Sequence, residues 1–180
     1  MKKALITIIA ILLVTFLVFF LTRDVKVPSE QTESASTDHV YASWDTTEFD
    51  KCVAAWLIVR FIDSDAKFIL YPQGTEINKG IVFDIPGAEW SRKHRKCTSD
   101  CILESLTLND PAVKRIVEIA HQIELNFWQL DRFPEAQKCF DEVREIFETT
   151  PDRAQALEKG RLYVETLCNE IKLSGKGKSE

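Results

Sequence analysis

The sequence predicts an α+β protein with a small sheet near the start of its soluble domain and a mainly helical half after it, preceded by one transmembrane helix. Three observations lead to this fold class. An uncharged apolar run occupies residues 4–21, short strand-like runs lie between residues 40 and 86, and apolar residues recur with a helical period beyond residue 98. A chain of 180 residues is long enough for one compact domain with a sizeable core.

The uncharged run is "ALITIIAILLVTFLVFFL", from Ala4 to Leu21. As a helix it would be about 27 Å long, close to the hydrocarbon thickness of a bilayer. A cleaved signal peptide is the alternative, but its apolar region usually has about 7–15 residues and ends near a small-residue cleavage site, which this run lacks. We therefore predict an uncleaved signal-anchor at residues 1–22, with residues 4–22 in the lipid bilayer.

The remaining chain divides into a tether, a domain and a tail. Residues 23–39 are rich in Ser, Thr and Glu and lack residues for a core, which predicts a flexible tether. The domain is expected at residues 40–173, followed by a disordered tail at residues 174–180. The default orientation for one N-terminal span places this domain outside the cytoplasm, so we predict a single-pass membrane protein with a periplasmic or other extracytoplasmic domain.

Charge and motif content exclude several classes of function. Without Lys2, Lys3 and Arg23, 20 basic residues stand against 28 acidic ones, a balance of −8, which predicts no nucleic-acid partner. The sequence has no Gly-rich phosphate loop, no G-x-S-x-G and no H-E-x-x-H. Five cysteines are an odd number, so an oxidising compartment would leave at least one of them unpaired.

The first half of the domain reads as strands around one helix. Strands are predicted at residues 40–44, 67–72 and 81–86, and a helix is predicted at residues 48–62 with Thr46 or Thr47 as its cap. Residues 88–97 are predicted to form an exposed loop.

The second half reads as a short helix and three longer ones. The short helix is predicted at residues 99–106. Asp110 before Pro111 is a favourable N-cap and first-position pair, and Pro134 and Thr150-Pro151 are predicted to open the two following helices. Each of the three longer segments has apolar residues at the 3.6-residue period.

Arg60 is the first candidate for a site residue, because it lies in a helix that is otherwise apolar almost all the way round. Trp56, one turn earlier, is placed to stack on the guanidinium, and Asp63, three residues later, is placed to pair with it. Two interpretations stay open. Arg60 is either part of a structural ion pair at the surface or an anchor for an anionic ligand.

His121 and Glu124 are the second candidate. Glu124 falls within the apolar stripe of its helix, and His121 precedes it by three residues, so the two side chains could bind one metal ion or share one proton. The sequence identifies no cofactor, and a metal ion is the candidate. The alternative is a surface glutamate beside a histidine that is hydrogen-bonded at the rim.

Cys97 and Asp84 complete the set of candidates. Residues 92–96, "RKHRK", lead into Cys97, and neighbouring cations lower a thiol pKa and raise its reactivity. The alternative is an ordinary thiol in a solvated loop. In a helix, Cys97 and Cys101 would lie on one face, within or near disulfide range. Asp84 ends a predicted strand, where a ligand-binding carboxylate or a turn-forming Asp is expected.

Several of these segments together resemble the chromate-resistance family, the C-terminal domain of ChrB-type proteins, over about residues 40–172. The most specific segment is D-x₅-W-L-I-x-R-F-I-D, from Asp50 to Asp63, followed by "FDIPGAEWS", Cys97, "LNDPAV" and "IAHQIEL". The resemblance implies a link to chromate resistance, possible sensing of chromium, and site positions at Asp84, Cys97, His121 and Glu124. In the H-D-x-D-like element, Gln122 stands in place of the first acid. A membrane span in place of the regulators' N-terminal domain argues against a DNA-binding regulator.

Three function hypotheses follow. The leading one is a membrane-anchored domain that binds or senses a metal ion or a small oxyanion at the cell envelope through Trp56, Arg60, Asp63, Asp84 and Cys97, with His121 and Glu124 as metal ligands. The second is a thiol- or metal-dependent enzyme that uses Cys97, His121 and Glu124. The third is a membrane adaptor protein without a catalytic site. We predict that Arg60, Asp84, His121 and Glu124 line one pocket, which would favour the first two hypotheses, whereas a large apolar patch would favour the third.

Overall fold

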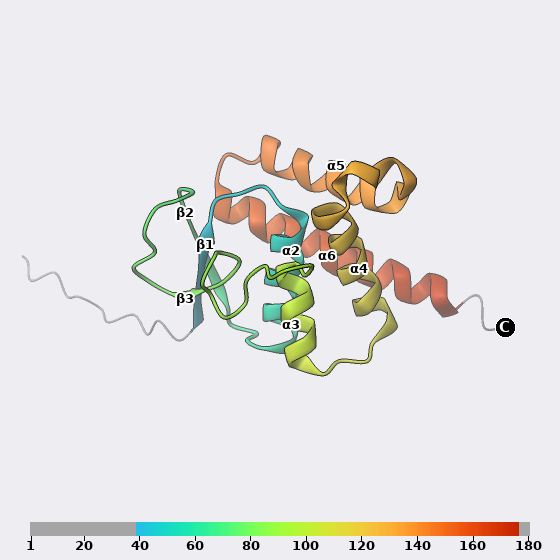
Figure 1. Ribbon diagram of the computed structural model, residues 1–180, viewed down its shortest axis with the longest axis horizontal. Helices are drawn as coiled ribbons and strands as arrows, with labels where there is room; N and C mark the ends of the chain where they lie inside the picture. Colours follow the sequence, from blue (N-terminus) through green and yellow to red (C-terminus); the bar gives the residue numbers. More distant parts are fainter. Residues whose placement is uncertain (1–38, 177–180) are drawn as a thin grey trace, which may run out of the picture. The chain divides into compact units, whose positions relative to one another are not determined.

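The computed structural model describes residues 39–176, apart from the side chains of residues 130–132 and 176 (Figure 1). The predicted signal-anchor at residues 1–22 and nearly all of the predicted tether lie outside the described residues. Within the described part, no helix combines the length and apolar character that crossing a membrane would require. The last helix continues to Lys176, so residues 174–176, which the sequence assigns to the disordered tail, are helical. The rest of the predicted tail lies outside the described residues.

The sheet has three parallel strands in the order β2-β1-β3, which confirms the small sheet near the start of the domain. β1 (Val40–Trp44) lies in the middle, and it pairs with β2 (Lys67–Tyr71) along its whole length and with β3 (Ile81–Val82) over two residues. β3 is shorter than the predicted strand, although the Phe83 N–H still donates to the Ala42 carbonyl. The three carboxyl ends therefore meet at one edge of the sheet.

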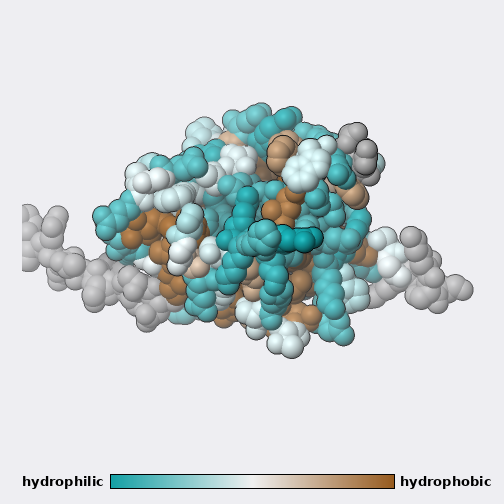
Figure 2. All heavy atoms as spheres, viewed as in Figure 1, coloured by the Kyte–Doolittle hydropathy of each residue, from teal (hydrophilic) through white to brown (hydrophobic). Residues whose placement is uncertain are grey.

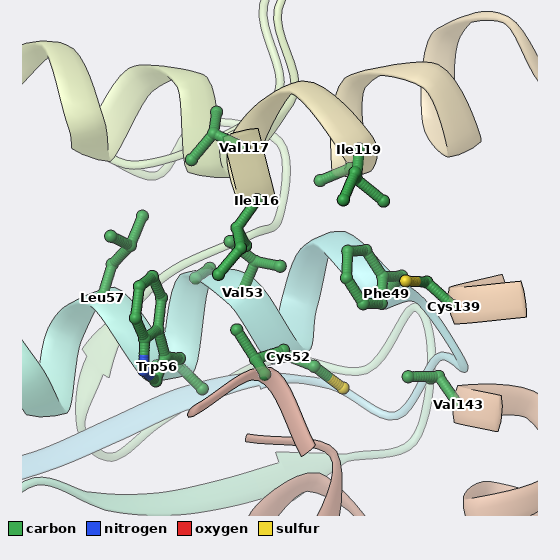
Figure 3. Close-up of a cluster of buried hydrophobic side chains, with 14 of the residues drawn as sticks. Phe49, Cys52, Val53, Trp56, Leu57, Ile116, Val117, Ile119, Cys139 and Val143 are labelled. Carbon is green, nitrogen blue, oxygen red and sulfur yellow. The ribbon is translucent and has the colours of Figure 1, made fainter. Parts of the chain in front are cut away.

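The helix α2 (Phe49–Phe61) forms the centre of the domain, which explains why it is apolar almost all the way round. Its residues 49–58 are buried, and it packs against α3 (Thr98–Leu106), α4 (Pro111–Leu125) and α6 (Arg153–Lys176) (Figure 3). Ile116 and Val117 of α4 approach it from one side, and Val143 of α5 (Pro134–Thr149) lies near its first turn. α6 approaches it so closely at Gly160 that a Cβ atom there would collide with the Cys52 sulfur.

The remaining helices follow the predicted order. They are α3 (Thr98–Leu106), α4 (Pro111–Leu125), α5 (Pro134–Thr149) and α6 (Arg153–Lys176). Asp110 caps α4 as predicted, since its side chain accepts hydrogen bonds from the N–H groups of Ala112 and Val113. Two details differ from the prediction. Glu48 occupies the N-cap position of α2 in place of a threonine, and a 3₁₀ helix, η2 (Phe127–Arg132), was not predicted.

The face of the molecule seen in Figure 2 is mainly hydrophilic, with smaller hydrophobic areas between the polar side chains. The most exposed aromatic residues of the described part are Phe127 and Trp128 on η2. The buried apolar residues collect mainly between α2 and the helices around it. The interior also contains two buried charged residues, Asp50 and Lys51.

Candidate functional site

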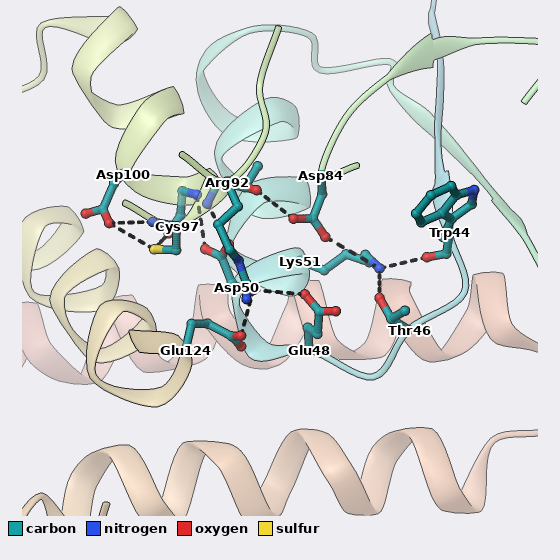
Figure 4. A network of polar contacts seen from close by, with 12 residues as sticks. Trp44, Thr46, Glu48, Asp50, Lys51, Asp84, Arg92, Cys97, Asp100 and Glu124 are labelled. Atoms are coloured by element: carbon teal, nitrogen blue, oxygen red, sulfur yellow. Dashed lines mark hydrogen bonds and ion pairs between the residues drawn. The ribbon is translucent and has the colours of Figure 1, made fainter. Parts of the chain in front are cut away.

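Two charged residues in the first turn of α2, Asp50 and Lys51, are completely buried. The Asp50 carboxylate accepts hydrogen bonds from the backbone N–H groups of Thr98, at 2.7 Å, and Ser99, at 3.0 Å (Figure 4). Those N–H groups belong to the first turn of α3 and have no partner within that helix. Burial raises the pKa of Asp50, and the hydrogen bonds from Ser99 and Thr98 oppose that rise. Asp50 therefore fixes the N-terminus of α3 to that of α2.

Asp84 lies two residues after the end of β3 and has a left-handed backbone conformation, with φ of 55°. Its Oδ1 atom accepts a hydrogen bond from the Thr98 hydroxyl at 2.6 Å. Its Oδ2 atom is buried, has no hydrogen-bond donor, and lies 3.5 Å from the ammonium nitrogen of Lys51. Burial, followed by the charge of Asp50, raises the pKa of Asp84 to about 7, while Lys51 opposes the rise. Asp84, which the sequence predicted at the strand end, therefore has one carboxylate oxygen without a hydrogen-bond donor.

The Lys51 ammonium joins the carboxyl ends of β1 and β3. It donates to the Trp44 carbonyl at 2.7 Å and to the Thr46 hydroxyl, and it forms the ion pair with Asp84 (Figure 4). A buried charge needs partners of this kind, because an isolated ammonium would lose its hydration without compensation. Lys51 thus acts as an internal cation beneath this edge of the sheet.

A pocket of about 250 Å³ lies at the same edge. Trp44 ends β1, Gln73 follows β2, and Asp84 follows β3, so each strand contributes to its wall from its carboxyl end. Ligands of open parallel sheets commonly bind outside the carboxyl ends of the strands. The other residues in the wall are Thr46, Glu48, Ile85, Pro86 and Arg92.

Arg92 connects this pocket to Glu124. Its guanidinium donates to Glu124 at 2.8 Å and to Glu48 at 3.3 Å. Burial, with the charges of Glu48 and Asp50, raises the pKa of Glu124 to about 7, and Arg92 opposes the rise. Glu124 is largely buried, as its place in the apolar stripe of α4 predicted, but its partner is an arginine and not His121.

His121 instead contacts Asp100, which the sequence analysis did not single out. The Nδ1 atom of His121 lies 2.9 Å from the Asp100 Oδ2 atom, and the same oxygen lies 3.0 Å from the Cys97 sulfur. One possible ligand atom from each of Cys97, Asp100 and His121 lies within 4.8 Å of the other two. Thiolate, carboxylate and imidazole are the groups that bind zinc-like metals. His121 and Glu124 therefore have different partners, and the donor atoms that lie close to His121 are those of Cys97 and Asp100.

The expectation of a reactive Cys97 is wrong. Cys97 is buried, and burial raises its pKa, as do the charges of Asp50 and Asp100. The cations of residues 92–96 therefore do not set the state of the thiol. Cys97 and Cys101 are not joined by a disulfide, and the other three cysteines are also free and buried.

Trp56, Arg60 and Asp63 belong to another part of the domain. The guanidinium of Arg60 pairs with Glu165 of α6 and lies 5.6 Å from the centre of the Trp56 ring, so the predicted stacking is confirmed. Trp56 donates to the same Glu165 side chain at 2.6 Å. Asp63 contacts His39, so its predicted pairing with Arg60 is wrong. The predicted pocket of Arg60, Asp84, His121 and Glu124 is also wrong, because Arg60 lies against Glu165 instead. A ligand-binding role for Trp56, Arg60 and Asp63 stays a prediction.

The polar cluster comprises Glu48, Asp50, Lys51, Asp84, Arg92, Cys97, Asp100, His121 and Glu124. Sequence reasoning missed several of these residues, and they differ in the sequence signals that could have identified them. Asp50 was within the family-like segment but was not assigned to the site. Asp100 follows Cys97 by three residues, and this is the spacing of a capping box. Glu48, Lys51 and Arg92 have no local signal, because charges next to a helix start or in a polar loop usually face solvent.

The fold and the cluster define a small α+β domain with buried charged groups at the carboxyl edge of a parallel sheet. Residues 41–171 match the family described as ChrB, C-terminal domain. Because the match covers most of the chain, the protein belongs to this family, which confirms the resemblance and links the chain to chromate resistance. No curated protein and no solved structure matches the chain.

Proposed function

We propose that the protein acts in chromate resistance as a membrane-tethered domain that binds a small charged ligand at the cell envelope. Family membership supports the link to chromate resistance. The uncharged run at residues 4–21 supports the tether, and the polar cluster at the edge of the sheet supports ligand binding.

The observation that carries the binding proposal is the state of Asp84. Its Oδ2 atom is buried beside a pocket and lacks a hydrogen-bond donor. A buried oxygen without a donor costs up to about 1–3 kcal/mol, and the ion pair with Lys51 at 3.5 Å offsets only part of that cost. A left-handed backbone at a residue other than glycine adds strain. Costs of this kind are typical of functional sites, because a ligand can offset them when it binds.

The charges around the pocket favour a cation over an oxyanion. Glu48 and Asp84 are acidic, and Arg92 is the one basic residue in the wall of this pocket. The buried Lys51 ammonium lies 3.5 Å from Asp84 and opposes a cation there, but it also has two hydrogen-bond acceptors of its own. Arg92 is already engaged by Glu48 and Glu124, so an oxyanion would have to compete with two carboxylates for it. A metal cation is therefore the better supported of the two ligand classes.

The proposal is tested by chromate tolerance in cells that produce the full chain. Asp84→Asn keeps the size of the side chain, removes its negative charge and should abolish the protection that the wild type gives. Glu104→Gln is the matched control, since Glu104 is an exposed acid paired with Lys96 outside the pocket. Equal protection by Asp84→Asn and the wild type, at equal amounts in the membrane fraction, would contradict the proposal. Recovery of the wild type in the soluble fraction would contradict the tether alone.

An adaptor is the second candidate, because of the aromatic residues on η2. Phe127 is 65% exposed and Trp128 is 63% exposed, and exposed aromatic residues are enriched at protein interfaces. The thiol enzyme has less support, since burial keeps Cys97 in its unreactive protonated form. An adaptor would give a protective effect that survives Asp84→Asn and is lost on replacing Phe127 and Trp128.

A further inference from the structure

We propose that Cys97, Asp100 and His121 form a binding site for a divalent transition-metal ion of the zinc type. The inference goes beyond the proposed function, because it assigns a ligand class to residues that do not line the Asp84 pocket. It also replaces the ligand pair that the sequence suggested with a set that the fold brings together.

The start of α3 brings two of the three donors together. Cys97 is the N-cap residue, and Asp100 is three residues later in a capping box. The Cys97 N–H donates to the Asp100 Oδ2 atom at 2.9 Å, which holds the carboxylate over the Cys97 sulfur. The Asp50 carboxylate accepts hydrogen bonds from the next two N–H groups of the same turn. The backbone that carries both metal-binding side chains is therefore fixed to α2.

The third donor comes from a separate helix. His121 lies in the second half of α4, and its imidazole reaches the same carboxylate oxygen of Asp100. A metal at this point would therefore link α3 to α4, which are separated by a loop in the sequence and pack against each other in the fold. Sites built on helices hold their geometry more precisely than sites on loops.

The distances and the burial suit a metal ion. Zinc bound at about 2.0–2.3 Å from each ligand in a tetrahedron requires donor atoms roughly 3.5 Å apart. The two short contacts here are 2.9 and 3.0 Å, so side-chain movements of less than about 1 Å would open the site. Cys97 is buried, whereas the side chains of Asp100 and His121 are 21% and 34% exposed and provide a route for the ion. Three protein ligands would leave a fourth position for water.

The alternative donor sets are less suitable. Glu124 is held by Arg92, so its recruitment to His121 would break an ion pair in a largely buried position. His39, Asp63 and Asp65 also have suitable spacing, but this group lies near the surface and lacks the thiol that favours zinc-like metals. Binding at Cys97 exchanges the thiol proton for the metal, and that proton passes to solvent.

The test is a cobalt titration of the full chain, purified in detergent, because Co²⁺ occupies zinc sites and reports its ligands by colour. We expect one Co²⁺ per chain, with a thiolate-to-cobalt charge-transfer band and strong visible bands of tetrahedral coordination, and displacement of both by Zn²⁺. Cys97→Ser should abolish the charge-transfer band. His121→Ala should weaken binding by more than the 10- to 100-fold that loss of an outer-shell partner causes.

Two matched variants serve as controls. Cys101→Ser replaces a thiol one turn away, and His94→Ala replaces an imidazole in the preceding loop; neither residue belongs to the proposed ligand set. Both should bind Co²⁺ as the wild type does. A folded wild type that binds no Co²⁺, or binds it without the thiolate band, would overturn the inference. Chromate protection that persists in His121→Ala would leave the proposed function standing, so the two failures are distinguishable.

Discussion

The carboxylate of Asp50, in the first turn of α2, accepts a hydrogen bond of 2.7 Å from the backbone N–H of Thr98, the first residue of α3. The contact joins residues 48 positions apart and is completely buried. It places Cys97 and Asp100 on one side of Asp50, and it places the Thr98 hydroxyl against Asp84 on the other (Figure 4). The position of both halves of the polar cluster therefore depends on one charged side chain.

Asp50→Ala should lower the free energy of unfolding strongly. The substitution leaves the N–H groups of Thr98 and Ser99 buried without an acceptor, at about 1–3 kcal/mol for each. Urea denaturation of the variant and the wild type measures the difference. Glu148→Ala, an exposed acid on α5, is the control and should change stability by less than about 0.5 kcal/mol. A loss of the same small size in Asp50→Ala would show that Asp50 does not anchor α3.

Stability should fall as the pH rises toward neutrality. Because the pKa of Glu124 is raised from 4.5 to about 7 in the folded protein, the folded state keeps a proton between these values that the unfolded chain releases. The resulting stabilisation is complete below about pH 4.5 and is lost as the pH rises through about 7, with a slope of up to about 1.4 kcal/mol per pH unit for this group. Asp84 acts in the same direction.

Glu124→Gln isolates the part of this pH dependence that Glu124 contributes. Glutamine cannot titrate, so the fall in stability between pH 5 and 7 should be shallower than in the wild type, as measured by urea denaturation at each pH. Glu118→Gln, on the exposed side of α4, should keep the wild-type slope. An unchanged slope in Glu124→Gln would mean that the folded and unfolded states titrate alike at this residue.

Arg60→Ala should reduce stability slightly and leave metal binding unchanged. Arg60 and Glu165 are each about one-third exposed, and such a pair contributes about 0–1 kcal/mol. The contact of the guanidinium with the Trp56 ring adds about 0.5–1 kcal/mol. Thermal denaturation and the cobalt titration measure the two effects separately. Loss of cobalt binding in a folded Arg60→Ala protein would show that Arg60 contributes to the metal site.

Patterns within single segments of the sequence predicted most of the described fold. The strand at 40–44, the cap at Asp110 and the burial of Glu124 each follow from the residues next to them, since strand composition, capping and apolar period are local properties. The short helix η2 was missed because it lacks a periodic apolar pattern long enough to identify it.

The candidate site was predicted only in part, because its geometry depends on contacts between distant segments. Asp84, Cys97, His121 and Glu124 were identified, but their partners Lys51, Arg92 and Asp100 were not. The pKa of Cys97 illustrates the reason. The five basic or imidazole residues before Cys97 are adjacent to it in sequence. Burial and the carboxylate of Asp50, from α2, nevertheless raise the pKa of its thiol. Arg60 was misplaced for the same reason, since Glu165 lies 105 residues away.

The most direct test of the metal site is an anomalous diffraction map from crystals of the full chain grown with Zn²⁺. The account predicts one peak per chain, about 2.3 Å from the Cys97 sulfur and about 2.0–2.2 Å from an Asp100 oxygen and a His121 nitrogen. A peak beside Asp84 and Glu48, with none between Cys97 and His121, would contradict it.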